Sequence, residues 1–159
     1  MQTRRQMLSR SAHSAAKVAA MLTAVGLWPA AAQAQGAGYS SAAFGAKTLA
    51  ELMKTLGAAM PTESKEVSVT GPDIAENGAV VPIGAATALP GVKRLLMLVE
   101  KNPTILAALF DISDAIDANI STRVKMGQSS NVYAVAMMND GRVLFAQKEI
   151  KVTLGGCGG

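Results

Sequence analysis

Several residue types on which catalytic sites depend are scarce in this chain. Its 159 residues include one histidine, His13, one tryptophan, Trp28, and one cysteine, Cys157. A single cysteine excludes an internal disulfide and a cysteine-rich zinc site. Because no histidine follows His13, the rest of the chain cannot contain a Ser-His-Asp or Cys-His catalytic arrangement, or a metal or haem held by histidine. Few groups remain for independent catalysis.

The first 34 residues have the features of an export signal. They contain four basic residues and no acidic one, and an apolar stretch over about 18–32 ends in Ala32-Gln33-Ala34. This pattern predicts a signal peptide that is cleaved near Gln35. The apolar stretch is shorter than the roughly 20 residues that span a bilayer. The pair Arg4-Arg5 ahead of Met7-Leu8 favours twin-arginine export over an ordinary Sec signal, so we expect a periplasmic protein without a membrane anchor.

The positive charge of the chain belongs to this leader. The formal net charge is +4, from 15 basic and 11 acidic residues. Removing the four basic residues of the leader leaves 11 of each, which is a neutral balance. Nucleic-acid binding needs clustered Lys and Arg side chains, so we expect no nucleic-acid partner.

Residues 48–57 carry the signals of one short N-terminal helix. Thr48 and Glu51 have the spacing of a capping box, and Gly57 suits the C-terminal end. Apolar residues at helical spacing form one stripe, which we interpret as a face that packs on a core. The stripe consists of Leu49, Leu52, Met53 and Leu56.

From Lys65 onward the pattern becomes that of β-strands. Some seven short apolar or alternating segments with turn signals between them predict an all-β antiparallel sandwich. Asp140-Gly141 is the strongest hairpin signal. Residues 105–110 could form a strand or a short helix, and we interpret Leu95–Leu98 as core. The expected strands cover 67–69, 79–83, 92–99, 120–126, 132–138, 142–146 and 150–154.

The last five residues, Gly155-Gly156-Cys157-Gly158-Gly159, hold the candidate functional group. Glycine has no Cβ and reaches backbone conformations closed to other residues, which predicts a thin, flexible arm. The three steps from Leu154 to Cys157 reach roughly 10 Å when extended. No cation or helix N-terminus lies nearby in sequence to favour the thiolate, so we expect partner proteins to activate Cys157. The predicted organisation is therefore a signal peptide (1–34), one domain (35–154) and a carrier arm (155–159).

The glycine-flanked cysteine resembles the C-terminal signature of the SoxY family, the sulfur carriers of the periplasmic thiosulfate-oxidising Sox system. The similarity continues inside the chain, at Glu76-Asn77-Gly78 with Val80-Val81-Pro82. It continues again from Ile120 through Asn131-Val132-Tyr133 and Asp140-Gly141 to Lys148–Val152.

This resemblance implies an immunoglobulin-like domain that carries sulfur intermediates on the Cys157 thiol. It implies a heterodimer with SoxZ, which would be exported already folded onto this subunit. The cytochrome complex SoxAX would join thiosulfate to Cys157, the hydrolase SoxB would release sulfate, and the sulfane dehydrogenase SoxCD would oxidise the remaining sulfur. The chain would itself be no enzyme and would need no cofactor or metal.

Two other functions fit parts of the pattern. An exported β-sandwich assembly module would use Cys157 for an intermolecular disulfide. A ubiquitin-like sulfur carrier also ends in Gly-Gly, but it would bear sulfur on the carboxylate of Gly159 after adenylation in the cytosol, against which the export signal argues. A thiol enzyme would lack a general base.

Overall fold

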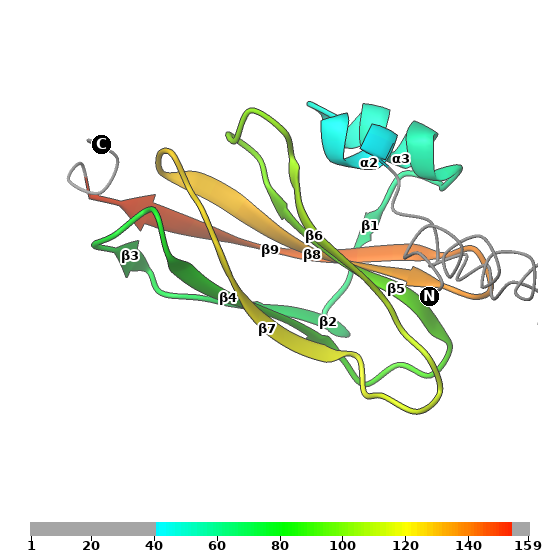
Figure 1. Ribbon diagram of the computed structural model, residues 1–159. Helices are drawn as coiled ribbons and strands as arrows, with labels where there is room; N and C mark the ends of the chain where they lie inside the picture. Colours follow the sequence, from blue (N-terminus) through cyan, green and yellow to red (C-terminus); the bar gives the residue numbers. More distant parts are fainter. Residues whose placement is uncertain (1–40, 154–159) are drawn as a thin grey trace, which may run out of the picture. The chain divides into compact units, whose positions relative to one another are not determined.

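The computed structural model describes residues 41–153 of the chain. These residues form two β-sheets, one of which is covered on its outer face by two short helices (Figure 1). The elements are α2 (Ser41–Gly45), α3 (Leu49–Leu56), β1 (Thr62–Glu63), β2 (Val67–Thr70), β3 (Ile74–Ala75), β4 (Val81–Thr87), β5 (Val92–Val99), β6 (Leu106–Asp111), β7 (Asn119–Val124), β8 (Ser130–Met138) and β9 (Val143–Val152).

The predicted helix is confirmed as α3, with the caps that its sequence indicates. The Thr48 hydroxyl accepts a hydrogen bond from the amide of Glu51 at 3.2 Å, and the Glu51 carboxylate accepts one from the amide of Lys47 at 2.9 Å. Gly57 ends the helix at a φ of 63°, a conformation that glycine adopts without strain. Helix α2, a single turn with the sequence SAAFG, is an addition to the one helix that we expected.

The larger sheet has the strand order β1-β9-β8-β5-β6 within residues 41–153, and β3 also pairs with β9. Its long strands are antiparallel, as predicted, whereas the two-residue strands β1 and β3 add parallel pairs to β9. The Asp140-Gly141 hairpin joins β8 to β9. The amide of Gly141 donates to the carbonyl of Met138 at 3.2 Å, and Gly141 takes a φ of 90° that favours glycine.

The smaller sheet, β2-β4-β7, packs against the inner face of the larger one. Val81 and Ile83 from the small sheet share one hydrophobic cluster with Leu95, Met97 and Val132 from the large sheet. The all-β sandwich expected from the sequence is therefore confirmed.

A second hydrophobic cluster fills the space between the larger sheet and the helices. Leu52 and Met53 of α3 pack there with Leu96 and Leu98 of β5. Strand β5 is thus buried on both faces, which explains why its apolar run does not alternate with polar residues. The interpretation of Leu95–Leu98 as core is confirmed, since each is at most 1% exposed.

Several strand boundaries differ from the sequence prediction, and three of the differences have a physical reason or resolve an open alternative. Of residues 105–110, left open between helix and strand, all but Ile105 belong to the edge strand β6. Strand β4 continues through Gly84 and Ala85, small residues with little strand propensity of their own. The segments 142–146 and 150–154 are predicted as separate strands, but residues 143–152 form one ten-residue strand, β9, because β8 pairs with it across the polar stretch Gln147–Glu149. Leu154 lies outside the described residues.

Neither of the helices in residues 41–153 has the length and apolar character needed to cross a membrane.

The two-sided burial of β5 predicts a large cost for shortening its side chains. Leu98 is fully buried under the helices, so Leu98→Ala should lower the free energy of unfolding by about 2–5 kcal/mol. Met60→Ala is the matched control, because Met60 is 58% exposed and should cost less than about 0.5 kcal/mol. Urea denaturation measures both values, and equal losses would contradict the two-cluster core.

Candidate functional site

The predicted carrier residues lie outside the part of the chain that the structure describes. These are Gly155, Gly156, Cys157, Gly158 and Gly159, together with Leu154. The signal peptide over 1–34 is outside it as well. What the structure does describe is the end of β9 and its neighbours, which we call the arm base and define as residues 73–80, 126–130 and 150–153. The arm base fixes the point from which the last six residues begin.

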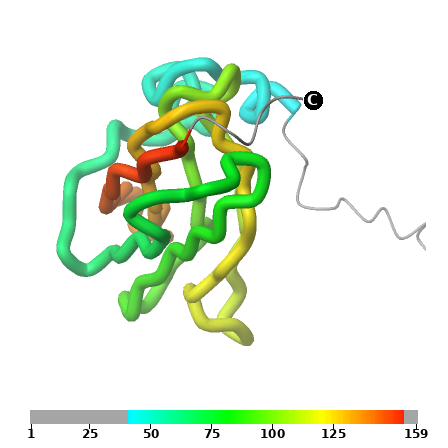
Figure 2. Tube along the Cα trace, turned by 90° about the vertical axis from the view of Figure 1, so that its left-hand side faces the viewer, coloured from blue at the N-terminus to red at the C-terminus, as the bar shows by residue number. Residues whose placement is uncertain are grey.

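One side of β9 is held at the arm base by the parallel strand β3. The amide of Lys151 donates to the carbonyl of Asp73 at 3.0 Å, and that of Thr153 donates to the carbonyl of Ala75 at 3.1 Å. The Thr153 hydroxyl adds a bond to the carbonyl of Glu76 at 3.3 Å. Thr153, the last described residue, is therefore bonded through both its backbone and its side chain. In Figure 2, which looks at this end, the red end of β9 lies beside the green segment that contains β3.

Ser129 holds the other side of β9. The last residue pair between β8 and β9 is Ser130 with Ile150, so Val152 has no strand partner on that side. The Ser129 hydroxyl accepts a hydrogen bond from the amide of Val152 at 2.9 Å and donates to its carbonyl at 3.5 Å. The Ser129 side chain thus replaces the next pair of backbone hydrogen bonds, and the end of β9 is fixed from both sides.

Gly78 packs directly on the end of β9. A Cβ at this position would clash with the carbonyl oxygen of Met126 and would lie 2.8 Å from Cγ1 of Val152. The Gly78 carbonyl accepts a hydrogen bond from the amide of Met126 at 2.7 Å. Glycine is needed here because the backbone approaches closely, and not because of its φ angle.

An ion pair fastens the chain that leads into β3. The ammonium of Lys148 lies 2.9 Å from Oδ1 of Asp73 and donates to the carbonyl of Gly71 at 2.6 Å. The pKa of the Asp73 carboxyl is lowered, first by the hydrogen bond from Lys148 and then by its charge. A lowered folded-state pKa stabilises the fold at pH values above the ordinary pKa of about 3.9. That contribution is lost as the pH falls through the lowered value.

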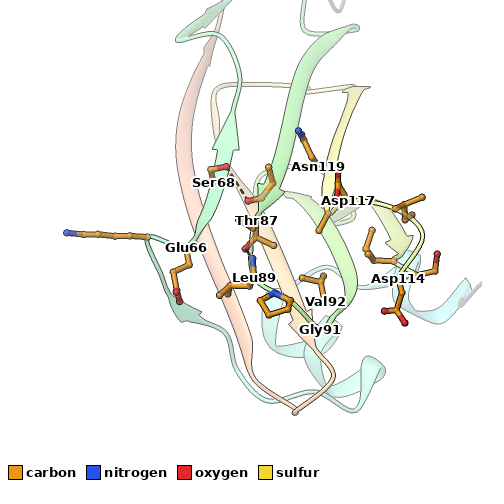
Figure 3. A pocket seen from close by; sticks show the side chains of 17 residues that line it. Glu66, Ser68, Thr87, Leu89, Gly91, Val92, Asp114, Asp117 and Asn119 are labelled. Atoms are coloured by element: carbon orange, nitrogen blue, oxygen red, sulfur yellow. Dashed lines mark hydrogen bonds between the residues drawn. The ribbon is translucent and has the colours of Figure 1, made fainter.

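A hollow of about 770 Å³ lies at the other end of the sandwich. Figure 3 shows Glu66, Asp114 and Asp117 around it, all three of them exposed. Among the described residues, no group of three or more His, Cys, Asp or Glu side chains could hold a metal ion. The same residues include no buried side-chain polar atom without a hydrogen-bond partner.

This hollow is too far away for the chain's own cysteine. The six residue steps of β4 from Val81, near the arm base, to Thr87, at the hollow, span about 20 Å at 3.3 Å per residue. Cys157 follows Thr153 by four residues, which limits the distance between their Cα atoms to about 13–14 Å. The Cys157 thiol therefore cannot reach this hollow within its own chain.

Most contacts of the arm base cannot be predicted from local sequence patterns. Asp73 and Ser129 carry no signal in the sequence, and Gly78 and Lys148 are marked only by their place in the family-like stretches. Ser129 bonds a residue 23 positions away, and Lys148 bonds Gly71, which is 77 positions away. No local pattern marks contacts of that separation.

Comparison with known proteins identifies a matching family. The family described as sulfur oxidation protein SoxY matches residues 52–157, a range that includes Cys157. No curated protein matches the chain.

Among solved structures, the sulfur carrier protein SoxY from Chlorobium limicola f thiosulfatophilum is 30% identical, with a TM-score of 0.58. The match covers 65% of this chain and 93% of that one. A superoxide reductase (neelaredoxin) from Ignicoccus hospitalis is 14% identical over 54% of this chain and 79% of its own, with a TM-score of 0.49. A putative superoxide reductase from Thermotoga maritima is 10% identical over 58% of this chain and 93% of its own, also with a TM-score of 0.49. These two scores are too low to carry an argument.

The packing of Gly78 predicts that Gly78→Ala loosens the arm base. The added methyl group would push the 76–80 segment away from β9, so the Thr153 amide should exchange its hydrogen at least tenfold faster, the effect of about 1.4 kcal/mol of local destabilisation. Hydrogen exchange followed by NMR measures this. The matched control is Gly127→Ala, because no atom lies within 4 Å of a Cβ at Gly127. Unchanged exchange at Thr153 in Gly78→Ala would show that this contact does not hold β9.

Proposed function

Because the chain belongs to the SoxY family of sulfur oxidation proteins, we propose that it carries thiosulfate-derived sulfur on the thiol of Cys157 and presents it to partner enzymes. The observation that carries this proposal is the fixed end of β9, with both sides of the strand bonded as far as Val152 and Thr153. A firm base four residues before the thiol lets the glycine-rich arm extend Cys157 away from the sandwich and into a partner's site.

The proposed loading step is an oxidation. The thiol of Cys157 loses its proton, and its sulfur forms a bond to the terminal sulfur of thiosulfate. Two electrons leave for the haem groups of SoxAX. The product is a cysteine S-thiosulfonate on the end of the arm.

The proposed second step is a hydrolysis by SoxB. Water attacks the sulfone sulfur of the conjugate, and the bond between the two thiosulfate-derived sulfur atoms breaks. Sulfate and two protons are released, and a persulfide remains on Cys157. Where SoxCD is present, it would oxidise the outer sulfur of this persulfide with oxygen atoms taken from water. The protons are released to solvent and the electrons leave with SoxCD, before SoxB acts again.

The setting that we propose for this chemistry is the periplasm. The Arg4-Arg5 leader supports export of the folded chain. We propose that SoxZ is bound during export and stays as the permanent partner subunit. SoxAX, SoxB and SoxCD bind transiently, because they act one after another on sulfur carried by the same cysteine.

The carrier function predicts adducts on Cys157 alone. Intact-mass spectrometry of the mature protein, incubated with thiosulfate and SoxAX, should show a gain of one thiosulfate unit, and peptide mapping should place it on Cys157. Cys157→Ser should gain nothing and should abolish thiosulfate oxidation. A Cys157→Ser protein that still supports oxidation would end the proposal. A disulfide-linked dimer as the working form would favour the assembly-module function instead.

The glycines of the arm predict a second effect. Gly155→Val or Gly156→Val adds a β-branched side chain that widens and stiffens the arm, so sulfate release by SoxB should fall at least tenfold. The alkylation rate of Cys157 by free iodoacetamide should stay the same, because a small reagent needs no narrow entry. The matched control is Gly127→Val, in an open loop of the described domain. Normal sulfate release by the Gly155 and Gly156 variants would contradict a role for a thin arm.

A further inference from the structure

Two exposed apolar side chains stand at the arm base. Ile74 is 57% exposed and Val80 is 51% exposed. They are two of four large hydrophobic residues exposed within residues 41–153, and the other two are Met60 and Ile116. Isolated apolar side chains are ordinary on protein surfaces. Ile74 and Val80 differ from such isolated side chains because they lie on the segment that bonds Thr153.

The segment from Ile74 to Val80, which we call the collar, is held firmly. Ile74 pairs with Lys151 of β9, and Gly78 packs against Val152. The Asn77–Val80 turn is closed by a bond from the amide of Val80 to the carbonyl of Asn77 at 3.3 Å. The Asn77 side chain also accepts a hydrogen bond from the amide of Ala79 at 2.9 Å. A collar fixed in this way loses little conformational entropy when another protein binds it.

The length of the arm limits how far away a partner can stand. The Cα of Cys157 lies within about 13–14 Å of the Cα of Thr153. When Cys157 enters a pocket of a partner, part of this length lies inside the pocket. The deeper the pocket is, the closer its entrance must lie to Thr153. An enzyme that encloses the sulfur therefore places the rim of its pocket against the residues that surround Thr153. Those residues include the collar.

We propose that the collar is the docking surface for the enzymes that act on Cys157, and that these enzymes carry apolar side chains on the rim of the pocket that receives the arm. This inference rests on the proposed carrier function. The charged side chains around the collar are of both signs, since Asp73, Glu76 and Lys151 are all exposed. Attraction to a partner of one charge is therefore weak, and apolar contacts provide the recognition. Two half-exposed side chains make a small contact, which suits partners that bind in turn and leave. A permanent subunit over the collar would close the approach to Thr153.

The test compares Ile74→Thr/Val80→Thr with Ile116→Thr, each in the mature chain bound to SoxZ and loaded with thiosulfate on Cys157. Threonine keeps the β-branch and removes apolar surface. Ile116 is the matched control, because it is 49% exposed and lines the hollow at the other end of the sandwich. With SoxB as the enzyme, the collar variant should raise KM for the loaded carrier about tenfold at unchanged kcat, the pattern of lost docking. Ile116→Thr should leave both constants unchanged.

Further measurements separate the possible causes. Alkylation of Cys157 by iodoacetamide should proceed at the same rate in all variants, which shows that the arm is intact. If the double variant folds poorly, the single variant Val80→Thr, which changes a loop residue, should still raise KM. An unchanged KM in both collar variants would overturn the docking surface, while adducts on Cys157 would leave the carrier function standing. Loss of SoxZ from the collar variant, or loss of a dimer formed by two copies of this chain, would also overturn the docking surface. Either result would show that the collar binds a subunit and not the enzymes. Absence of adducts from the unaltered protein would instead refute the carrier function itself.

Discussion

The pairing of β3 with the end of β9 is the interaction on which the rest of this site depends. Two backbone hydrogen bonds, from Lys151 to Asp73 and from Thr153 to Ala75, hold the strand on one side. The Ser129 hydroxyl holds it on the other. A strand that frayed here would leave no fixed point from which the last six residues begin. Because both sides are bonded, the distance that the thiol can cover is set by covalent geometry alone.

The two hydrophobic clusters explain why β9 can serve as an anchor. Leu144 and Ile150 face the cluster between the sheets, whereas Val143 and Phe145 face the cluster beneath the helices. Shifting β9 along its axis by one residue would move each of these side chains to the opposite face. Burial along the whole strand therefore determines the register of β9, and the same register fixes which residues of β9 lie at the arm base. Helix α3 contributes to the site only through this packing, at a distance from it.

Local signals in the sequence predicted the elements whose causes are local. The Thr48-Glu51 cap, the Gly57 stop and the Asp140-Gly141 hairpin each depend on residues a few positions apart, and each is confirmed. The continuous strand β9 could not be predicted, because its polar middle is supported by β8 and not by its own pattern. Strand β3 is two residues long, and Ile74 and Ala75 carry no periodic signal. The arm base was missed for the same reason, since its bonds join residues far apart in sequence. Cys157 stays a prediction, made from the chemistry of a lone thiol among glycines, and it lies outside the described residues.

The places where this chain resembles its family acquire a physical meaning at the arm base. The stretch Glu76-Asn77-Gly78 with Val80-Val81-Pro82 and the stretch Lys148–Val152 lie 66 positions or more apart, yet Gly78 packs on Val152. Glu76 also accepts a hydrogen bond from Thr153, the residue that follows the second stretch. Their shared task is thus to hold the end of β9 in place. A carrier whose partners supply the catalysis needs this above all, because a partner can meet the sulfur only where a fixed base presents it.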